Sequence, residues 1–169
     1  MSNDEENQGN QTVRRFERLE LLKNDCEELA MCARSDDQIG FQQNQEMSGL
    51  VFQIDNGVAT PETMTRLSNV FREYNSSWLE HLRKQSSLIR KFSSTLADEL
   101  DVQINQVETE TRGLIEEISG MSGEELLGIQ EHVSLSIKNH GHSFGILFNR
   151  CKITVGRIKT DISAISDVL

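Results

Sequence analysis

Residues 60–92, which read TPETMTRLSNVFREYNSSWLEHLRKQSSLIRKF, decide the fold of this chain. The segment opens with Thr60-Pro61-Glu62, a helix-capping threonine followed by a proline and an acid in the first turn. Apolar or aromatic residues then recur at alternating steps of three and four, which is the spacing of one helix face. The stripe is Met64, Leu67, Phe71, Tyr74 and Trp78, and its register continues through His81, Gln85, Leu88 and Phe92. A helix of this kind needs another helix to cover its apolar face.

A second apolar stripe follows Phe92 in a shifted register. It consists of Leu96, Leu100, Ile104, Val107, Leu114, Ile118 and Met121, with Thr111 in the gap. A phase shift of this kind marks a change in supercoiling, a change of partner helix or a hinge. Because no proline or glycine lies between Pro61 and Gly113, we predict one continuous coiled-coil helix over residues 61–120.

The chain before this helix divides into a polar tail and a helical region. Residues 1–11 are polar and acidic, so we predict a disordered tail. For residues 12–56 we predict an N-terminal helical hairpin. Its first helix is expected to end near Arg34, and Ser35-Asp36-Asp37-Gln38 resembles a capping box that opens the second. Asn56-Gly57 is a left-handed turn signal that ends this region.

The last segment, residues 122–169, is predicted to pack back on the long helix. Ser122-Gly123-Glu124-Glu125 is a second capping box, and apolar residues recur at helical spacing to Leu169. Residues 139–143 are either part of this helix or a break before a last helix capped by Ser143. The expected fold is therefore all-α, an elongated antiparallel helical bundle or coiled coil with one long central helix.

Composition limits the classes of function. The chain has 169 residues, a formal net charge of −10 and a single proline. Such an acidic chain repels nucleic-acid phosphates, so we expect no nucleic-acid partner. No run of about twenty apolar residues predicts a membrane span, and the N-terminus resembles neither a signal nor a transit peptide. Three cysteines without a secretion signal predict reduced thiols and a cytoplasmic location, with the nucleus as the alternative.

Few residues suggest catalysis or metal binding. His132, His140 and His142 are eight and two residues apart, which does not bring three ligands to one helix face. Cys26 and Cys32 are too far apart in sequence for a redox or zinc pair, and Cys26 falls on an apolar stripe, as does Cys151. We therefore expect no enzyme, cofactor, metal or small-molecule substrate, and keep a helical metal protein or enzyme that uses the histidines as an alternative.

Two groups of residues are candidates for partner binding. The first is the aromatic and apolar part of the stripe, where tryptophan and tyrosine favour protein contact: Phe71, Tyr74, Trp78, Leu88 and Phe92. The second is a basic patch in the last helix: Arg150, Lys152, Arg157 and Lys159. A similar basic cluster, Arg83, Lys84, Arg90 and Lys91, borders the long stripe. Both basic groups are expected to pair with acidic faces of neighbouring helices.

These patterns predict a non-enzymatic helical scaffold or interaction subunit of a multi-protein assembly. It would act through coiled-coil packing with itself or with other helical chains. The alternative is a peripheral adaptor that binds an anionic membrane or polymer through the basic patch of the last helix. The long stripe and the stripe from Leu19 to Leu29 predict a homo-oligomer, or a chain that behaves poorly without a partner.

Overall fold

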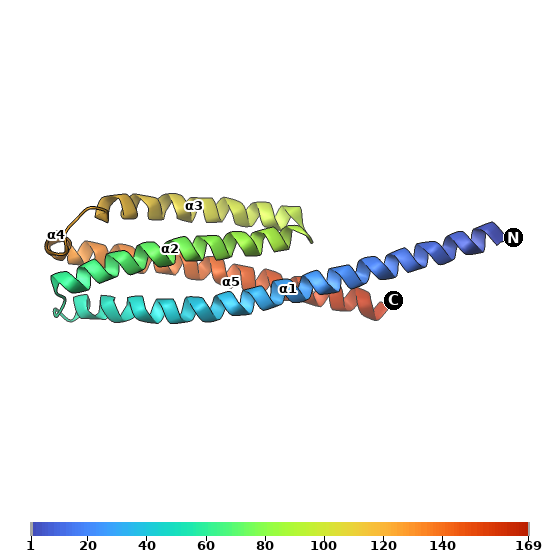
Figure 1. The fold of residues 1–169 in the computed structure, drawn as a ribbon, viewed down its shortest axis with the longest axis horizontal. Helices are drawn as coiled ribbons and strands as arrows, with labels where there is room; N and C mark the ends of the chain where they lie inside the picture. Colours follow the sequence, from blue (N-terminus) through green and yellow to red (C-terminus); the bar gives the residue numbers. More distant parts are fainter. Residues whose placement is uncertain (1, 169) are drawn as a thin grey trace.

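The computed structural model describes the backbone of residues 2–168 and the side chains of residue 5 and residues 7–167. The described chain is almost entirely helical. Its elements are α1 (Ser2–Asp55), α2 (Pro61–Arg90), α3 (Ser94–Ile118), α4 (Gly123–Gly128) and α5 (Gln130–Val168). The prediction of an all-α, elongated antiparallel bundle is confirmed (Figure 1).

Four long helices form the bundle and alternate in direction along its axis (Figure 1). α1 packs against α2 and α5, α3 packs against α2 and α5, and α2 and α5 also touch across the diagonal. The short α4 closes one end beside the start of α2. There the lack of a side chain at Gly123 lets the start of α4 approach the start of α2 closely. A Cβ atom at this position would lie 2.3 Å from the carbonyl oxygen of Pro61.

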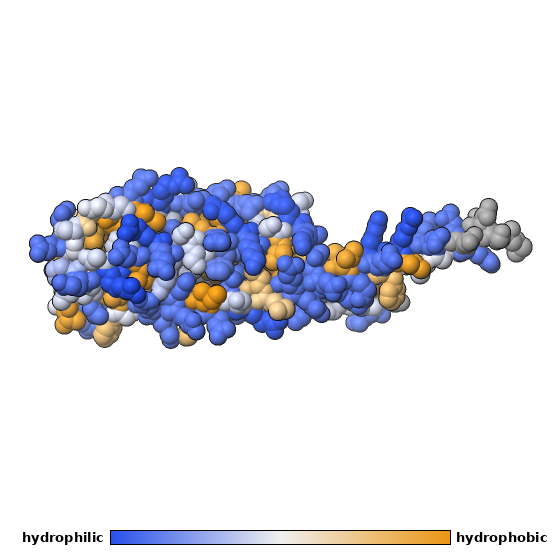
Figure 2. All heavy atoms as spheres, viewed as in Figure 1, coloured by the Kyte–Doolittle hydropathy of each residue, from blue (hydrophilic) through white to orange (hydrophobic). Residues whose placement is uncertain are grey.

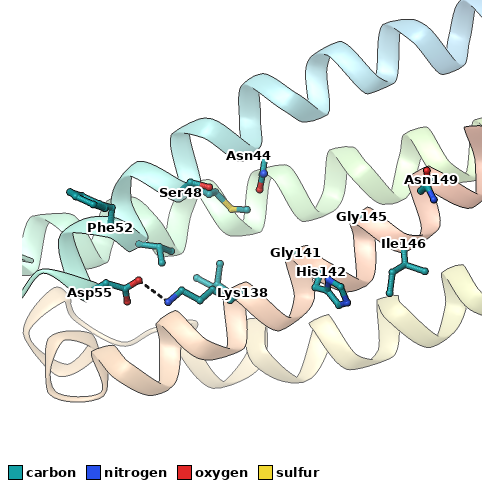
Figure 3. A pocket seen from close by; sticks show the side chains of 13 residues that line it. Asn44, Ser48, Phe52, Asp55, Lys138, Gly141, His142, Gly145, Ile146 and Asn149 are labelled. Carbon is teal, nitrogen blue, oxygen red and sulfur yellow. Dashed lines mark hydrogen bonds and ion pairs between the residues drawn. The ribbon is translucent and has the colours of Figure 1, made fainter.

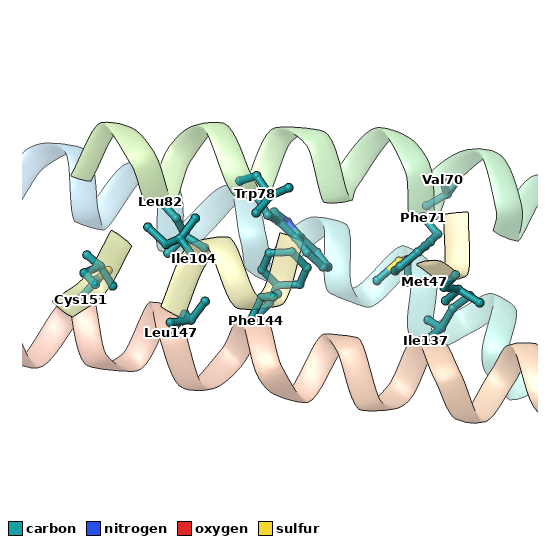
Figure 4. Packing of buried hydrophobic residues seen from close by; sticks show 14 of the residues in the cluster. Met47, Val70, Phe71, Trp78, Leu82, Ile104, Ile137, Phe144, Leu147 and Cys151 are labelled. Carbon is teal, nitrogen blue, oxygen red and sulfur yellow. The ribbon is translucent and has the colours of Figure 1, made fainter. Parts of the chain in front are cut away.

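The core is a series of apolar layers along the bundle axis (Figure 4). The central layer places Trp78 against Phe144 with ring centroids 5.0 Å apart, in an edge-to-face arrangement. On one side of it lies a layer that contains Phe71, and on the other side lies a layer that contains Leu82. The stripe that begins at residue 64 is thus the centre of the fold, and helices of the same chain cover it.

The prediction of one continuous helix over residues 61–120 is wrong. The chain turns at residues 91–93, and α3 runs back along α2. Ser93 caps α3 by accepting a hydrogen bond from the backbone of Leu96, and Arg90 pairs with Asp98 and Asp101 across the turn. The shifted register therefore marks a hairpin, which needs neither proline nor glycine because the Ser93 side chain satisfies the first turn of α3.

The predictions for the N-terminal region are also wrong. Residues 2–11 are helical rather than disordered, residue 1 lies outside the described residues, and α1 continues through residues 35–38 without a hairpin. Polar residues occupy inward-facing positions of α1 and are paired there. The Trp78 Nε1 donates to Gln43, Tyr74 donates to Glu46, and the Asp36 carboxylate lies in the core. These bonds between helices fill the interval between the buried apolar residues Leu29 and Met47 of α1.

Several terminators were predicted correctly. Gly57 and Gly120 have φ values of 71° and 82°, the left-handed geometry of a helix C-terminus. Thr60 forms a capping box with Thr63, and Ser122 accepts from the backbone of Glu125 at 3.2 Å. The open question at residues 139–143 is also answered, because α5 is continuous there.

Candidate interaction surfaces

The bundle is complete only where α2 and α3 are present. Lys91, at the turn between them, pairs with Asp25 of α1 at 3.2 Å and lies 3.9 Å from Glu28. Beyond this level only α1 and α5 continue, and α1 extends further than α5 (Figure 1). The inner face of the α1–α5 pair loses its cover there, so that Ile162 is half-buried and Ile165 is exposed.

Residues 2–18 of α1, which we call the overhang, form the most isolated segment of the described chain (Figure 1). Every residue from 7 to 18 is exposed, and the first buried residue of α1 is Leu19, at 5% exposure. Val13 and Phe16 are its large apolar side chains, and Phe16 is 57% exposed. Between residues 7 and 18 the surface is otherwise mostly hydrophilic (Figure 2). Sequence reasoning placed residues 12–18 in a helix and missed only the helical residues 2–11, which include no large apolar residue.

A groove follows the outer contact between α1 and α5. One hollow in it, of about 650 Å³, lies between Phe52 and Asp55 on α1 and Lys138, Gly141 and Gly145 on α5 (Figure 3). Lys138 donates to Asp55 at 2.7 Å, and this bond lowers the pKa of the Asp55 carboxyl. Neither glycine approaches a neighbour, because a Cβ atom on either would meet nothing within 4 Å. Glycine therefore widens the groove rather than allowing closer helix packing.

The predicted partner-binding residues lie inside the monomer. Phe71, Trp78 and Leu88 are buried in the core of the bundle. Tyr74 and Phe92 are half-buried and pack against the same core. The hydroxyl of Tyr74 donates to Glu46, which raises the Tyr74 pKa to about 12. Packing within one chain thus accounts for this stripe, so its length alone no longer argues for an oligomer.

A polar cluster interrupts the apolar core where α1 meets α2. The Asp36 carboxylate, 4% exposed, lies 2.8 Å from the His81 Nδ1 and accepts a hydrogen bond from the Gln85 Nε2, also at 2.8 Å. Cys32 donates to the same carboxylate at 3.5 Å. The cluster fixes the register of α1 against α2, because a slip of one turn would leave a buried carboxylate without these partners.

The residues of the basic patch are all exposed but do not form one unit. Lys152 pairs with Asp37 at 3.6 Å, and both Lys152 and Lys159 line a hollow beside α1. Arg150 and Arg157 form no ion pair with any side chain that the structure describes. In the other basic cluster, Arg83 pairs with Glu108, and Arg90 and Lys91 also pair with acids of this chain. Pairing between helices is thus confirmed within the chain for three residues of that cluster and for Lys152.

The histidines singled out in the sequence do not meet. His132 lies 3.1 Å from Glu117 of α3, His140 packs on Phe71, and His142 lines the groove. Among the described residues, no group of three histidine, cysteine, aspartate or glutamate side chains is arranged to hold a metal ion. The structure therefore offers no support for the alternative of a histidine-based metal site.

The three cysteines are free, and the pKa of each thiol is raised. Burial raises the pKa of Cys151 to about 12. Burial and the neighbouring Asp36 raise the pKa of Cys32 to about 11, and burial also raises the pKa of Cys26. Thiolates are the nucleophilic form of cysteine, so none of these side chains suits nucleophilic catalysis at neutral pH.

Comparison with known proteins gives no relative: no family model, curated protein or solved structure matches this chain. Within residues 2–168, no helix combines the length and the apolar character needed to cross a membrane. The fold is an elongated all-α bundle. Because one fold can carry many functions, the function of this protein has to be inferred from its surfaces.

Proposed function

We propose that this protein is a non-enzymatic helical interaction subunit of a larger assembly and that the overhang is its binding element. The observation that carries the proposal is the exposure of every residue from 7 to 18 on a helix that projects past the bundle. An isolated helix of this length is marginal in water, and Gly9 weakens it further. Packing against another helix would supply the missing stabilisation.

Two further features support a role without catalysis. The pKa values of the cysteines are raised, so that no thiolate is available at neutral pH. The buried Asp36 carboxylate is bonded to His81 and Gln85, as expected of a group that positions two helices. Free thiols are consistent with a reducing compartment, and we place the protein in the cytoplasm or the nucleus.

Deleting residues 2–18 tests the proposal. Affinity purification from the native cell is carried out with the full chain and the truncated chain as baits. We expect the truncated chain to keep its cooperative thermal unfolding and to lose the helical proteins that copurify with the full chain, copies of itself included. The matched control is Val102→Asp, at an exposed position of α3 outside the overhang, which should retain them. An unchanged set of copurified proteins after truncation would refute the proposal.

A second candidate is attachment to an anionic membrane or polymer through α5. Arg150 and Arg157 favour it, because both are exposed and neither forms an ion pair with a described side chain. Each basic residue near an anionic membrane contributes about 1 kcal/mol, which the net charge of −10 opposes. Sedimentation with anionic vesicles that is abolished in Arg150→Glu/Arg157→Glu, with assembly intact, would rank this candidate first.

A further inference from the structure

The hollows between α1 and α5 join into one groove. The hollow of about 650 Å³ beside Phe52 is followed along α1 by one of about 220 Å³ beside Phe41 and by one of about 250 Å³ beside Arg34. Successive hollows share lining residues, which are Asn44, Gly141 and Gly145 for the first two and Asp37 and Phe148 for the last two. From Arg34 to Phe52 this α1–α5 groove is ~27 Å long at ~1.5 Å per residue.

Glycines keep the α5 side of the groove open. Gly141, Gly145 and Gly156 line its hollows from inside α5, and a Cβ atom on any of them would meet nothing within 4 Å. Glycine weakens a helix relative to alanine, and the packing of this bundle does not require it at these three positions. Its physical effect here is to let another chain approach the backbone of α5 closely.

Exposed apolar side chains lie along the same groove. Phe41 and Phe52 of α1 are 64% and 66% exposed, and their spacing of eleven residues places them on one face of the helix, about three turns apart. Ile146 of α5 is 51% exposed and lines the same hollow as Phe52 (Figure 3). The apolar face of a further helix, laid along the groove, would cover all three side chains.

Among the described residues that line the groove, every acid already has a partner within this chain. Asp55 pairs with Lys138, and Asp37 pairs with Lys152. The Asp36 carboxylate is buried and belongs to the polar cluster between α1 and α2. The described walls of the groove therefore present no unpaired carboxylate to an approaching chain.

Two basic residues of the groove, in contrast, lack an acidic partner. Arg34 lines the hollow of about 250 Å³ from α1 and Lys159 lines it from α5, and neither forms an ion pair with a described side chain. Glu27 and Asp167 line the next hollow with them but lie beyond ion-pair distance of both. Although the net charge of the chain is −10, this end of the groove attracts a negative group.

We infer that the α1–α5 groove binds an acidic amphipathic helix of another protein. The apolar face of that helix would pack on Phe41, Phe52 and Ile146, and one of its carboxylates would lie between Arg34 and Lys159. A helix fits because the groove is straight and is bounded by two helices along its whole length. The groove is a second binding surface, separate from the overhang, and this inference goes beyond the proposed function.

Two synthetic peptides test the inference by fluorescence anisotropy. The acidic peptide has three repeats of Glu-Leu-Glu-Glu-Leu-Leu-Glu and spans ~32 Å as a helix at ~1.5 Å per residue. The basic peptide has lysine in place of every glutamate. The net charge of the chain favours the basic peptide, so only a local site can reverse this preference.

The full chain should bind the acidic peptide at least tenfold more tightly than the basic one, and the affinity should fall as the salt concentration rises. Equal binding of the two peptides, tighter binding of the basic one, or no binding of either would overturn the inference.

A glycine substitution locates the binding site. Gly145→Leu fills the groove where space is open, so the protein should stay folded while its affinity for the acidic peptide falls at least tenfold. The matched control is Gly113→Leu, at an exposed glycine of α3 whose Cβ atom would also meet nothing within 4 Å, and it should bind like the wild type. Wild-type affinity in Gly145→Leu would mean that the peptide binds elsewhere, contrary to the inference.

A charge reversal tests the carboxylate position. Arg34→Glu/Lys159→Glu should weaken binding of the acidic peptide at least tenfold. The matched control, Arg150→Glu/Arg157→Glu, makes the same change of net charge at exposed positions of α5 that line none of these hollows, and it should keep the wild-type affinity. Equal weakening in both variants would show that only overall charge matters and would overturn the inference.

The inference and the proposed function fail in different ways. A chain without residues 2–18 should bind the acidic peptide like the full chain, because the groove begins at Arg34. Loss of peptide binding on truncation would place the peptide at the overhang and overturn the inference, whereas the proposed function depends on the copurified proteins alone. Self-association that the acidic peptide competes away and that Gly145→Leu abolishes would make a second copy the occupant, which also overturns it.

Discussion

At the scale of single residues, polar side chains give this core its register. Asp36, His81 and Gln85 meet inside the bundle, and Gln43 accepts a hydrogen bond from Trp78 at 2.6 Å. Apolar side chains can slide past one another at small cost, whereas a buried carboxylate must keep its partners. These residues therefore align α1 with α2, although a count of apolar positions makes this part of α1 look weak.

The Asp36 cluster leads to the first prediction. His81→Leu leaves the buried carboxylate without one of its partners and should lower the free energy of unfolding by ~3 kcal/mol. The double variant Asp36→Leu/His81→Leu removes both polar groups and should recover most of that loss. Urea titration measures both. A double variant that is less stable than the single one would show that the pair itself stabilises the fold.

The second prediction concerns His140, which packs against Phe71 with ring centroids 6.1 Å apart. Burial lowers the pKa of His140 below its ordinary value of 6.5, while the charge of Glu110 on α3 opposes the shift in part. Above pH 6.5 the imidazole is neutral in both states and its contribution to stability is complete. As the pH falls below that value the unfolded chain takes up the proton first, so the free energy of unfolding declines.

Thermal unfolding at a series of pH values measures this effect. His140→Phe should remove the part of the decline that begins near pH 6.5. It should not alter a separate loss at lower pH, where Glu46 and Asp55, whose pKa values are lowered by hydrogen bonds from Tyr74 and Lys138, take up protons. An identical pH profile in the variant would contradict the assignment.

At the scale of elements, side-chain caps and glycines decide where helices begin, turn and separate. The turn between α2 and α3 depends on Ser93, whose hydroxyl accepts from the backbone of Leu96 at 3.3 Å. The groove between α1 and α5 depends on Gly141 and Gly145, because these residues have no side chain and no neighbour fills the space. Neither feature changes the hydrophobic pattern, so both are visible only when the helices are placed in space.

The third prediction concerns the α2–α3 turn. Ser93→Ala removes the cap of α3 and should lower the free energy of unfolding by ~1 kcal/mol. Ser93→Asp, which keeps a side-chain acceptor at this position, is the matched control and should unfold like the wild type. Equal stability of all three proteins in urea would mean that the cap does not determine the turn.

The fourth prediction concerns the groove. Gly145 lies inside α5, and a Cβ atom there would meet nothing within 4 Å. Gly145→Ala should raise the free energy of unfolding by ~1 kcal/mol, because alanine favours the helix and the space is open. Gly123→Ala is the contrasting variant, since its Cβ atom would lie 2.3 Å from the Pro61 carbonyl oxygen, and it should destabilise the protein. A loss of stability in Gly145→Ala would show that the groove is filled.

At the scale of the whole molecule, the overhang makes the protein much longer than its bundle (Figure 1). α1 has 54 residues and therefore spans ~80 Å at ~1.5 Å per residue. The protein therefore consists of a compact four-helix body and a helix that projects from it.

The fifth prediction uses this length. Small-angle X-ray scattering should give a maximum dimension of ~80 Å for the full chain in dilute solution, and removal of residues 2–18 should shorten it by ~25 Å at ~1.5 Å per residue. An unchanged maximum dimension after truncation would show that the overhang does not project from the bundle.

The sequence by itself determined the fold class and several boundaries. The stripe from Met64 to Trp78 lies in the core, and Thr60, Gly57 and Gly120 end or begin helices as expected, because these features depend on local backbone chemistry. It could not reveal the turn at Ser93, since a phase shift is compatible with either a continuous helix or a reversal.

Only the tertiary structure decided which apolar stripes the chain covers with its own helices. It buried the predicted binding residue Trp78 in the core, and it made residues 2–11, which were predicted to be a disordered tail, the first turns of α1. Periodicity shows that a face needs a partner but not which helix supplies it, because that depends on the lengths of helices and the positions of turns. Here the turn between α2 and α3 lies level with Asp25, and the candidate site, residues 2–18 of α1, lies beyond it.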